Sequence, residues 1–297
     1  NKGHEVMVYL SYIIDNYENL PDINIFLHAH RFSWHNNELL TDGPPSHNPT
    51  NPFGDAVQMI SRLSNERVTR EGYMNLRCHW DPGCPVWLQP NSTELELAKQ
   101  EQQLIGQAWV ELFPFDPIPD ELSQPCCAQF ALSAERIRQV PLGRYVWMRD
   151  WMLRTELTDY VSGRVFEYTW QYIFTGRSTV CPSMYQCYCD GYGVCFKGER
   201  EFDKWFEIRY YRNQAQLKLD HWHEVAQQVE VLKNDGNEAA LAEMQRPNEE
   251  EKEALEKEIE LLEAELAVRK KAAMERGKHA RIRAAESGRE WHEGDGF

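Results

Sequence analysis

Residues 23–35 read Ile-Asn-Ile-Phe-Leu-His-Ala-His-Arg-Phe-Ser-Trp-His. β-Branched and aromatic residues dominate the first five positions, which predicts a short strand over residues 23–27. Because side chains alternate faces along a strand, His28 and His30 project the same way just past its end. In open α/β sheets, ligands bind at the carboxyl edge of the strands. This stretch therefore predicts both a buried strand and a candidate site.

The segments on either side alternate between helical and strand patterns. Helical patterns occupy residues 5–17, 94–113, 143–153 and 162–174. Residues 127–132 form a second strand pattern, and Ser133 follows it as the expected N-cap of a short helix. This alternation predicts an α/β fold in which a layered mixed sheet is flanked by helices.

The composition sets broad limits on the class of protein. The chain has 297 residues, a formal net charge of −15 and 42% hydrophobic residues. This length suits one large domain or a domain with an appendage, and the hydrophobic content excludes a disordered chain. The acidic balance argues against nucleic-acid binding, because neutralising phosphates requires clustered Lys and Arg. No apolar run approaches the ~18 residues that a membrane-spanning helix needs.

Charge density and cysteine content divide the chain near residue 200. Charged residues make up 40 of the first 200 positions but 39 of the last 97. All eight cysteines lie between Cys78 and Cys195. We therefore expect a cysteine-containing α/β domain over residues 1–200 and a charged helical extension over residues 201–297.

The extension carries two helical patterns. Residues 202–232 are amphipathic and are expected to dock on the domain. Residues 249–273 place one apolar stripe along a helix, formed by Leu255, Ile259, Leu262 and Leu266. Two interpretations of this stripe remain open: the helix stays within its own chain, or it forms a homodimer through a short coiled coil. The polar tail after Gly277 is expected to fray.

The cysteine spacing favours disulfides over zinc. Zinc sites use paired ligands about two to four residues apart, whereas Cys187 and Cys189 are separated by a single residue. The last four cysteines lie in a Gly- and Pro-containing segment of the kind that disulfides hold in place. A glycosylation acceptor, Asn91-Ser92-Thr93, agrees with a secretory route. We expect disulfides in an oxidising compartment, with zinc and free thiols as alternatives, and the spacing leaves the connectivity open.

The histidines after the first strand are candidates for ligand contact. Two imidazoles at i and i+2 are suited to hold a divalent cation or to bracket an anionic group. We predict His28 and His30 as metal ligands, with His35 as a candidate third residue. Arg31 and His35 are predicted to contact substrate. The alternative is that these histidines only make structural hydrogen bonds.

Further polar residues stand in apolar surroundings. Glu167 lies on a mostly apolar helix with Arg164 one turn earlier, and such a carboxylate must be paired, solvated or functional. We predict Glu167 as a catalytic base or sugar contact and Arg164 as a substrate contact; the alternative is a surface ion pair between them. Gln129, in an apolar strand, and Asn75 with Arg77 are predicted to line a pocket, because buried amides need partners.

Signatures of several common enzyme classes are missing from the sequence. It has no Gly-x-Ser-x-Gly, no Gly-x-x-x-x-Gly-Lys, no dinucleotide glycine fingerprint and no His-Glu-x-x-His. This argues against an α/β serine hydrolase, a P-loop nucleotidase, a Rossmann dehydrogenase and a zincin. Other enzyme classes remain open.

Together these segments resemble a fungal family that is known as a domain of unknown function. The resemblance rests on eight motifs, which lie at residues 1–5, 9–22, 25–35, 75–85, 111–114, 126–137, 162–174 and 181–195. Members of that family usually begin earlier, with a strand and often a membrane anchor. The resemblance therefore implies an upstream segment before Asn1 and membrane attachment only through such an anchor.

The order of the motifs is similar to that of glycosyltransferases with a nucleotide-sugar-binding (glycosyltransferase-A-like) α/β fold. The similarity implies that residues 28–30, His-Ala-His, stand where those enzymes carry an acidic, metal-binding triplet. This is a departure, because two histidines are a different ligand set from the aspartates that hold manganese.

Three functions follow as hypotheses. The first is a glycosyltransferase-like enzyme of the secretory lumen (Golgi), which takes a nucleotide sugar and a glycan acceptor and uses a divalent metal ion. The second is a secreted or membrane-tethered glycan-binding domain without catalysis. The third is a histidine-based metalloenzyme.

Overall fold

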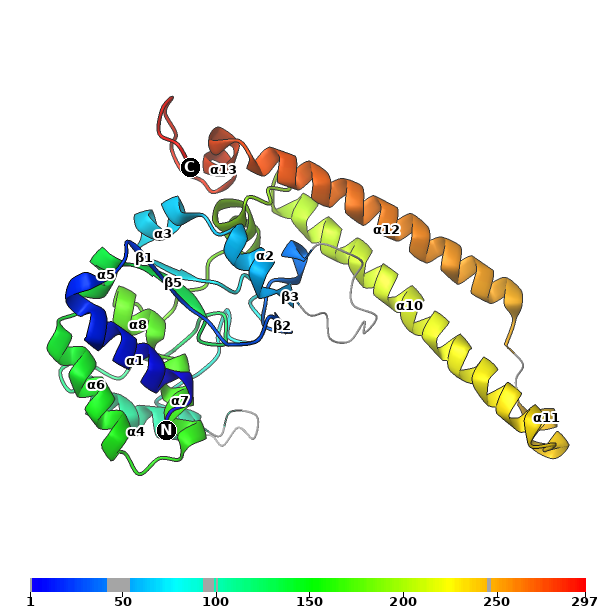
Figure 1. Cartoon of the computed structure of the whole chain (residues 1–297), viewed down its shortest axis with the longest axis horizontal. Coiled ribbons are helices and arrows are strands. Elements are labelled where there is room, and N and C mark those ends of the chain that lie inside the picture. Colours follow the sequence, from blue (N-terminus) through cyan, green and yellow to red (C-terminus); the bar gives the residue numbers. More distant parts are fainter. Residues whose placement is uncertain (1, 42–53, 93–98, 100, 245–246) are drawn as a thin grey trace.

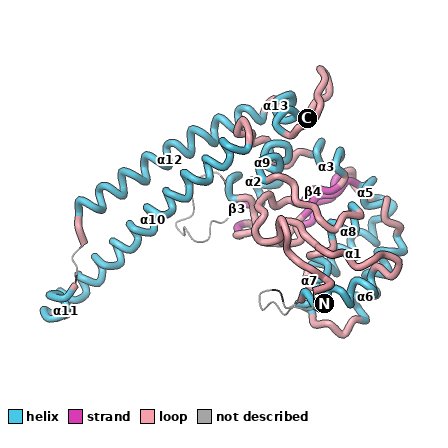
Figure 2. Tube along the Cα trace, turned by 180° about the vertical axis from the view of Figure 1, so that it is seen from behind, coloured by secondary structure: helices cyan, strands magenta, loops and turns pink. Residues whose placement is uncertain are grey.

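A computed structural model describes residues 2–41, 54–92, 99, 101–244 and 247–297 (Figure 1). The fold is mixed α and β, with a small antiparallel sheet and a C-terminal helical region. Figure 1 shows a rounded part, which we call the body and which comprises the described residues up to Gly198, and a long helical hairpin that projects from it. Seen from behind, the short strands lie within the body, surrounded by helices and loops (Figure 2).

The central sheet has the strand order β1-β5-β4, formed by β1 (Ile23–Phe26), β5 (Phe130–Ser133) and β4 (Tyr73–Asn75). Both pairings are antiparallel. The predicted strand over residues 23–27 is present and ends one residue earlier. The predicted strand over residues 127–132 begins only at Phe130, because Cys127 and Ala128 have positive φ angles that an extended chain does not adopt. The rule about the carboxyl edge of parallel strands therefore does not apply here.

The sheet is the middle layer of the body. On β5, Phe130 and Leu132 belong to one core cluster and Ala131 belongs to another, as the alternation of side chains along a strand requires. The first cluster packs against α1 (Glu5–Asn16), α4 (Gln102–Leu112), α6 (Leu142–Arg154), α7 (Asp159–Glu167) and α8 (Trp170–Thr175). The second packs against α2 (Ala56–Ser61), α3 (Asn65–Glu71) and the start of the hairpin.

Shorter elements connect these layers. A second sheet pairs β2 (Phe32–Ser33) with β3 (Gly54–Asp55). Single turns are η1 (Tyr17–Asn19), η2 (Glu38–Leu40), α9 (Met184–Gln186) and the π-helical η4 (Cys187–Gly191). Ser133 caps α5 (Ala134–Arg138) as predicted, because its hydroxyl accepts a hydrogen bond from the amide of Arg136.

Two predicted helices differ from the structure. The segment 162–174 forms two helices, α7 and α8, instead of one, and the N-cap of α7 is Thr158 rather than Ser162. Thr158 takes this role because its side chain accepts a hydrogen bond from the amide of Val161. In the segment 94–113, the described helix begins at Gln102, and residues 94–98 and 100 lie outside the described residues.

All eight cysteines form disulfides, so the interpretation that favoured disulfides is confirmed and those of zinc binding and free thiols are wrong. The pairs are Cys78–Cys187, Cys84–Cys181, Cys126–Cys127 and Cys189–Cys195. Two of them join distant parts of the body, and one joins neighbours in the sequence. Such cross-links are compatible with a secreted or lumenal protein.

The hairpin consists of α10 (Glu199–Asn234), α11 (Glu238–Glu243) and α12 (Glu249–Gly277). At its base, Phe202 and Trp205 of α10 lie in the second core cluster, together with Leu266 and Ala273 of α12. The predicted apolar stripe packs inside the chain, because Leu255 and Ile259 form a cluster with α10.

The tail after Gly277 does not fray as predicted. It forms α13 (Ala280–Glu286), and the segment beyond that helix returns to the body. Arg289 lies 3.0 Å from the carboxylate of Asp190, and Glu286 pairs with Arg276. The first of these ion pairs joins distant parts of the chain, and the second joins the end of α13 to α12; together they hold a segment whose local sequence is merely polar.

Candidate functional site

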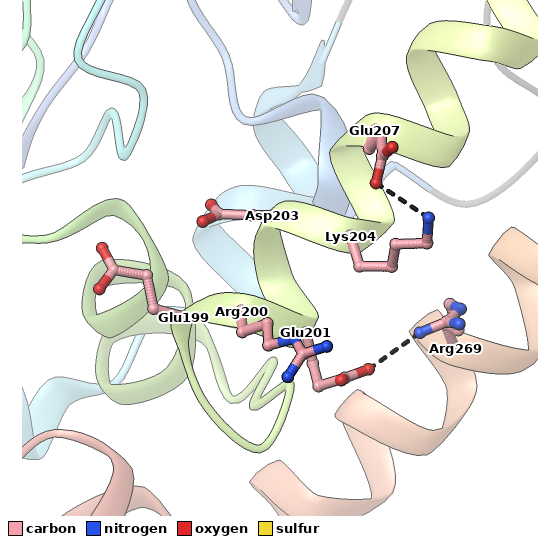
Figure 3. Close-up of a pocket in the computed structure, with 7 residues that line it drawn as sticks. All are labelled: Glu199, Arg200, Glu201, Asp203, Lys204, Glu207 and Arg269. Carbon is pink, nitrogen blue, oxygen red and sulfur yellow. Dashed lines mark hydrogen bonds and ion pairs between the residues drawn. The ribbon is translucent and has the colours of Figure 1, made fainter.

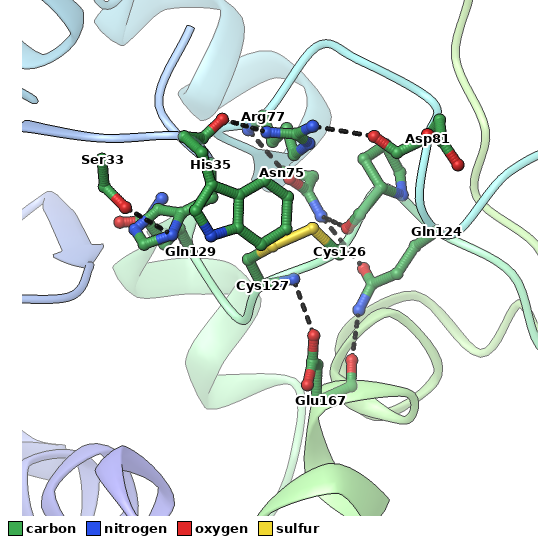
Figure 4. Close-up of a disulfide and its surroundings, with 12 residues drawn as sticks. Ser33, His35, Asn75, Arg77, Asp81, Gln124, Cys126, Cys127, Gln129 and Glu167 are labelled. Carbon is green, nitrogen blue, oxygen red and sulfur yellow. Dashed lines mark hydrogen bonds between the residues drawn. A yellow bond between two sulfur atoms is a disulfide. The ribbon is translucent and has the colours of Figure 1, made fainter. Parts of the chain in front are cut away.

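The adjacent cysteines Cys126 and Cys127 form a disulfide directly before β5 (Figure 4). This bond closes a small ring that includes the peptide bond between the two residues. Cys127 has a φ of 86° and Ala128 a φ of 49°, both in a region that residues other than glycine rarely adopt. Backbone of this kind is held in place only by its surroundings and is concentrated at functional sites.

A turn from another part of the body supports this ring. The amide of Cys126 donates a hydrogen bond to the carbonyl of Pro82, 3.1 Å away. Gly83, with a φ of 125°, lies so close that a Cβ atom there would be 1.9 Å from the carbonyl oxygen of Gln124. The motif at residues 75–85 therefore needs glycine at position 83, because the two backbones touch.

His28 and Glu167 meet at the peptide groups of Cys127. The amide of Cys127 donates to Oε1 of Glu167 over 2.9 Å, and Nε2 of His28 lies 2.7 Å from the carbonyl of Cys127. A carbonyl can only accept, so Nε2 of His28 carries the proton in this contact. Burial raises the pKa of Glu167, and the nearby charge of Arg164 opposes that rise. The two predicted residues, far apart in sequence, thus come together at the disulfide.

Arg164, which is half-buried, is part of an ion network with Glu167 and Glu101. Its Nη1 lies 3.0 Å from Oε2 of Glu167, and its Nη2 lies 2.8 Å from Oε1 of Glu101. The same Glu101 oxygen accepts the hydroxyl of Tyr168 at 2.7 Å. Both carboxylate oxygens of Glu167 therefore already accept hydrogen bonds within the protein.

The predicted amide side chains hold the backbone around the disulfide. Oε1 of Gln129 accepts from the amide of His28 at 3.1 Å. Nδ2 of Asn75 donates to the carbonyl of Pro125 at 2.6 Å, and its Oδ1 accepts from the amide of Arg77 at 2.9 Å. Both amides are buried, so these bonds fix the loop that carries the cysteines.

His35 and Arg77 lie beside this loop and keep unpaired nitrogens. Nδ1 of His35 is 2.9 Å from the hydroxyl of Ser33, and its Nε2 has no hydrogen-bond partner among the described residues. Burial, then the charges of His28, Arg77 and His30, lowers the pKa of His35 to about 4, so its ring is neutral. Nε of Arg77 is likewise unpaired within the described part of the chain.

Trp34 is the exposed aromatic residue of the site, and the sequence prediction omitted it. Its indole is 45% exposed, its ring centroid lies 5.7 Å from that of His35, and the guanidinium of Arg77 stacks on it at 5.0 Å. No local sequence signal identified it, because Trp34 points outward only by virtue of the burial of Ser33, which the fold decides. We call Trp34, His35, Arg77, Gln129 and the Cys126–Cys127 disulfide together the disulfide site.

Two predicted residues lie at its margin. His30 is exposed. Arg31 is exposed and pairs with Asp55 at 3.1 Å, and it stacks on Phe32. Arg31 therefore already has a partner that fixes β2 against β3.

A third metal ligand for the histidine pair is missing from the described residues. Among the described residues, one group of three has ligand atoms close enough to share an ion, namely Cys189, Cys195 and Glu286. The two sulfurs of this group are joined in a disulfide. His28 uses Nε2 for the Cys127 carbonyl, which leaves Nδ1 as its free nitrogen.

A hollow of about 920 Å³ lies elsewhere, at the base of the hairpin (Figure 3). It is lined by charged residues only: Glu199, Arg200, Glu201, Asp203, Lys204, Glu207 and Arg269. Lys204 pairs with Glu207, and Arg269 pairs with Glu201. Small-molecule pockets are mostly apolar, so this hollow is better explained as a solvated groove between α10 and α12.

The fold and the site define a disulfide-braced α/β domain with a strained vicinal disulfide in a buried polar cluster. The chain belongs to the family described as "Protein of unknown function (DUF3431)", whose model matches residues 1–190. No curated protein and no solved structure matches it. Among the described helices, none combines the length and apolar character needed to cross a bilayer.

Proposed function

We propose that the domain over residues 1–200 binds a carbohydrate at the disulfide site, in the secretory lumen or outside the cell. The observation that carries the proposal is the exposed indole of Trp34, which lies beside the buried imidazole of His35 and the stacked guanidinium of Arg77. Buried polar atoms are nearly always hydrogen-bonded, and Nε2 of His35 has no partner in the described part of the chain, which leaves it available to a ligand that displaces the atoms covering it.

Sugars match this combination of groups. A pyranose ring presents a face of C–H groups that packs on an indole, and it carries hydroxyls around its edge that accept and donate hydrogen bonds. His35, with a neutral ring, offers one such bond from Nε2. Binding sites in general combine an aromatic surface with a few fixed polar groups.

The vicinal disulfide supports binding by keeping the site rigid. The backbone of Cys127 is fixed on both sides, by Glu167 at its amide and by His28 at its carbonyl. Cys127 itself is only half-buried, so its polarisable sulfur lies near the surface. A preorganised site loses less conformational entropy when the ligand binds.

The test is retention on immobilised polysaccharides, measured by affinity electrophoresis, for wild type and two variants. Trp34→Ala is expected to abolish retention, because the stacking surface is gone. Trp147→Ala is the matched control, since Trp147 is 41% exposed on α6 and also carries a stacked arginine, Arg154. The proposal is wrong if no polysaccharide retains the wild type, or if both variants behave alike.

Sugar transfer is a second candidate, supported by one observation at the same site. Glu167 has a raised pKa and touches the Cys127 amide, and carboxylates tuned by burial act as general acids or bases. The order of the motifs supports a glycosyltransferase-A-like arrangement with a nucleotide-sugar donor. In this proposal His28 and His30 contact a divalent metal ion or the diphosphate.

Turnover of nucleotide sugars, followed by release of the nucleoside diphosphate with and without Mn²⁺ or Mg²⁺, tests the transfer reaction. Glu167→Gln is expected to lower turnover at least about a hundredfold if Glu167 is the base. Unchanged turnover in this variant would remove Glu167 from catalysis. Retention on polysaccharide without any consumption of nucleotide sugar would contradict the transfer reaction and support carbohydrate binding without catalysis.

A further inference from the structure

Three described arginines are buried, and they differ in how their charges are balanced. Arg209 pairs with Glu38, and Arg212 pairs with Glu263. Arg77 is 6% exposed, yet no carboxylate of the described residues lies within ion-pair distance of it. Its two Nη atoms donate to the carbonyls of Trp34 and Asp81, at 3.0 and 2.7 Å. Carbonyls solvate the guanidinium but carry no full charge, and the charge of the exposed Asp81 acts on it only from beyond ion-pair distance.

Burying an unpaired charge is costly, so a protein retains one where something else supplies the counter-charge. Arg77 lies beside Trp34 and His35 in the disulfide site, and its Nε is unpaired in the described part of the chain. Nε2 of His35 is unpaired there too. Two buried nitrogens without acceptors therefore belong to neighbouring residues of one site.

The fixed charge beside these nitrogens is that of Arg77, which also acts on the ring of His35. Two carboxylates lie in the surroundings. Glu167 binds Arg164 and the Cys127 amide, and the exposed Asp81 acts on Arg77 only from beyond ion-pair distance. A buried arginine without an ion pair stands out in a chain whose formal net charge is −15.

We propose that the ligand of the disulfide site is an anionic sugar, whose carboxylate or phosphate oxygens are bound by Arg77 and His35 while its ring packs on Trp34. This inference rests on the proposed carbohydrate binding and adds the chemical class of the ligand. The guanidinium of an arginine is suited to this role, because its donors match the geometry of carboxylate and phosphate oxygens.

The oxyanion has two sources, a uronic acid within a polysaccharide or a phosphorylated sugar, and both supply the same acceptor atoms. The positive charge of Arg77 would attract either ligand as it approaches. That attraction depends on ionic strength, because salt screens charges over about 10 Å at 0.1 M while the ligand is still in solvent.

The experiment is isothermal titration of the full chain with four probes at low and high salt. The probes are an oligogalacturonide, the neutral galactan of equal length, mannose 6-phosphate and mannose. We expect at least one anionic sugar to bind about tenfold or more tightly than its neutral counterpart, the contribution of one hydrogen bond to a charged group. The preference is expected to shrink at high salt.

The outcomes separate this inference from the proposed function. If neutral and anionic sugars bind equally, the inference is wrong and carbohydrate binding stands. If no probe binds and no polysaccharide retains the protein, carbohydrate binding itself is wrong. Which of the two anionic probes binds identifies the source of the oxyanion.

Variants assign the preference to residues. Arg77→Met keeps the aliphatic stem and is expected to remove the preference for the anionic sugar. Because Arg77 is buried, Arg77→Lys provides a second variant that keeps a positive charge at this position, and it is expected to retain part of the preference. Arg154→Gln, at the stacked Arg154–Trp147 pair, is the matched control and should retain the preference. A full preference in a folded Arg77→Met would overturn the assignment. If neither Arg77 variant folds, unchanged binding of the anionic sugar by Trp34→Ala, a variant at a 45% exposed position, would overturn it.

Discussion

The body and the hairpin are both helical at their surfaces, yet they are stabilised in different ways. The body has four disulfides and two core clusters on either side of a sheet. Beyond its base, the described part of the hairpin is joined by a cluster of four buried residues, Ala215, Leu219, Leu255 and Ile259, by the ion pair between Arg212 and Glu263, and by a hydrogen bond from the indole of Trp222 to the carbonyl of Asn248. The candidate site lies in the body, where covalent and packing constraints fix side chains most firmly.

This difference indicates which part of the molecule can hold hydrogen-bonding groups in fixed positions. The peptide of Cys127 is held by bonds from residues 28 and 167, which lie on opposite sides of it in the sequence. The tip of the hairpin is held mostly by contacts between neighbouring turns of two helices. A ligand site needs the first kind of support, because small displacements weaken directed hydrogen bonds.

The largest expected effect comes from the disulfides of the body. Cys78–Cys187 closes a loop with a sequence separation of 109, and Cys189–Cys195 closes one of 6, while all four cysteines are buried. Cys78→Ala with Cys187→Ala is expected to lower the free energy of unfolding by about 5 kcal/mol, against about 2 kcal/mol for Cys189→Ala with Cys195→Ala. Urea unfolding followed by tryptophan fluorescence measures both. Equal losses would show that loop length does not set the stability of the body.

The next effect distinguishes the base of the hairpin from its outer part. Trp205 is buried at the base, and its indole N–H donates to the carbonyl of Leu266 at 3.1 Å. Trp205→Ala is expected to cost about 3–5 kcal/mol, and Ile259→Ala, in the outer cluster, about 2 kcal/mol.

Hydrogen exchange locates these losses. Trp205→Ala should speed exchange along α10 and α12 and in the core cluster beneath them. Ile259→Ala should speed exchange only in the outer part of the two helices and leave β1 and β5 protected. Faster exchange of the sheet in Ile259→Ala would mean that the hairpin and the body unfold as one unit.

Acid should destabilise the body through its buried histidines. Burial lowers the pKa of His35 to about 4 and that of His79 to about 3, from 6.5 in the unfolded chain. Between pH 6.5 and pH 4 the unfolded chain binds more protons at these histidines than the folded protein does. The free energy of unfolding therefore falls as the pH drops through this range. The contribution of His35 is about 3 kcal/mol. The measurement is the free energy of unfolding at several pH values in this range. His35→Asn should make this free energy less dependent on pH, and an unchanged pH dependence in that variant would exclude His35 as a cause.

The smallest effect is expected on the hairpin surface. Lys204 and Glu207 pair at 2.9 Å with both side chains about half exposed. Glu207→Gln should change the free energy of unfolding by less than about 0.5 kcal/mol, because exposed ion pairs contribute little. Glu101→Gln, which removes a buried partner of Arg164 in the body, should cost several times more. Thermal unfolding of both variants measures the two losses of stability. Equal losses would contradict the expectation that the buried pair contributes more than the exposed one.

Local patterns predicted much of the secondary structure. The helical spacing of residues 5–17 and 143–153 gave α1 and α6 almost to the residue, since the spacing of apolar side chains defines the buried face of a helix. The break at Thr169 was missed, because helical propensity and an apolar face continue across it. The C-terminal tail was predicted wrongly for another reason: Glu286, at the end of α13, pairs with Arg276 of α12, and Arg289 beyond it pairs with the distant Asp190.

The candidate site was predicted as separate residues, and its assembly was not. His28, His35, Asn75, Arg77, Gln129 and Glu167 were chosen because polar groups in apolar surroundings need partners, and the structure places them around one disulfide. Trp34 and the role of the adjacent cysteines were missed, because an exposed aromatic and a pair of cysteines are ambiguous until their neighbours are known.

By itself, the sequence determined the α/β class, the use of cysteines for disulfides and the change of character near residue 200, since these depend on composition and on patterns a few residues long. Only the tertiary structure decided that Cys126 pairs with its neighbour, that the sheet is antiparallel and that His28 and Glu167 bind the carbonyl and the amide of the same residue, Cys127. Contacts between distant segments depend on how the whole chain packs, and no short pattern records them.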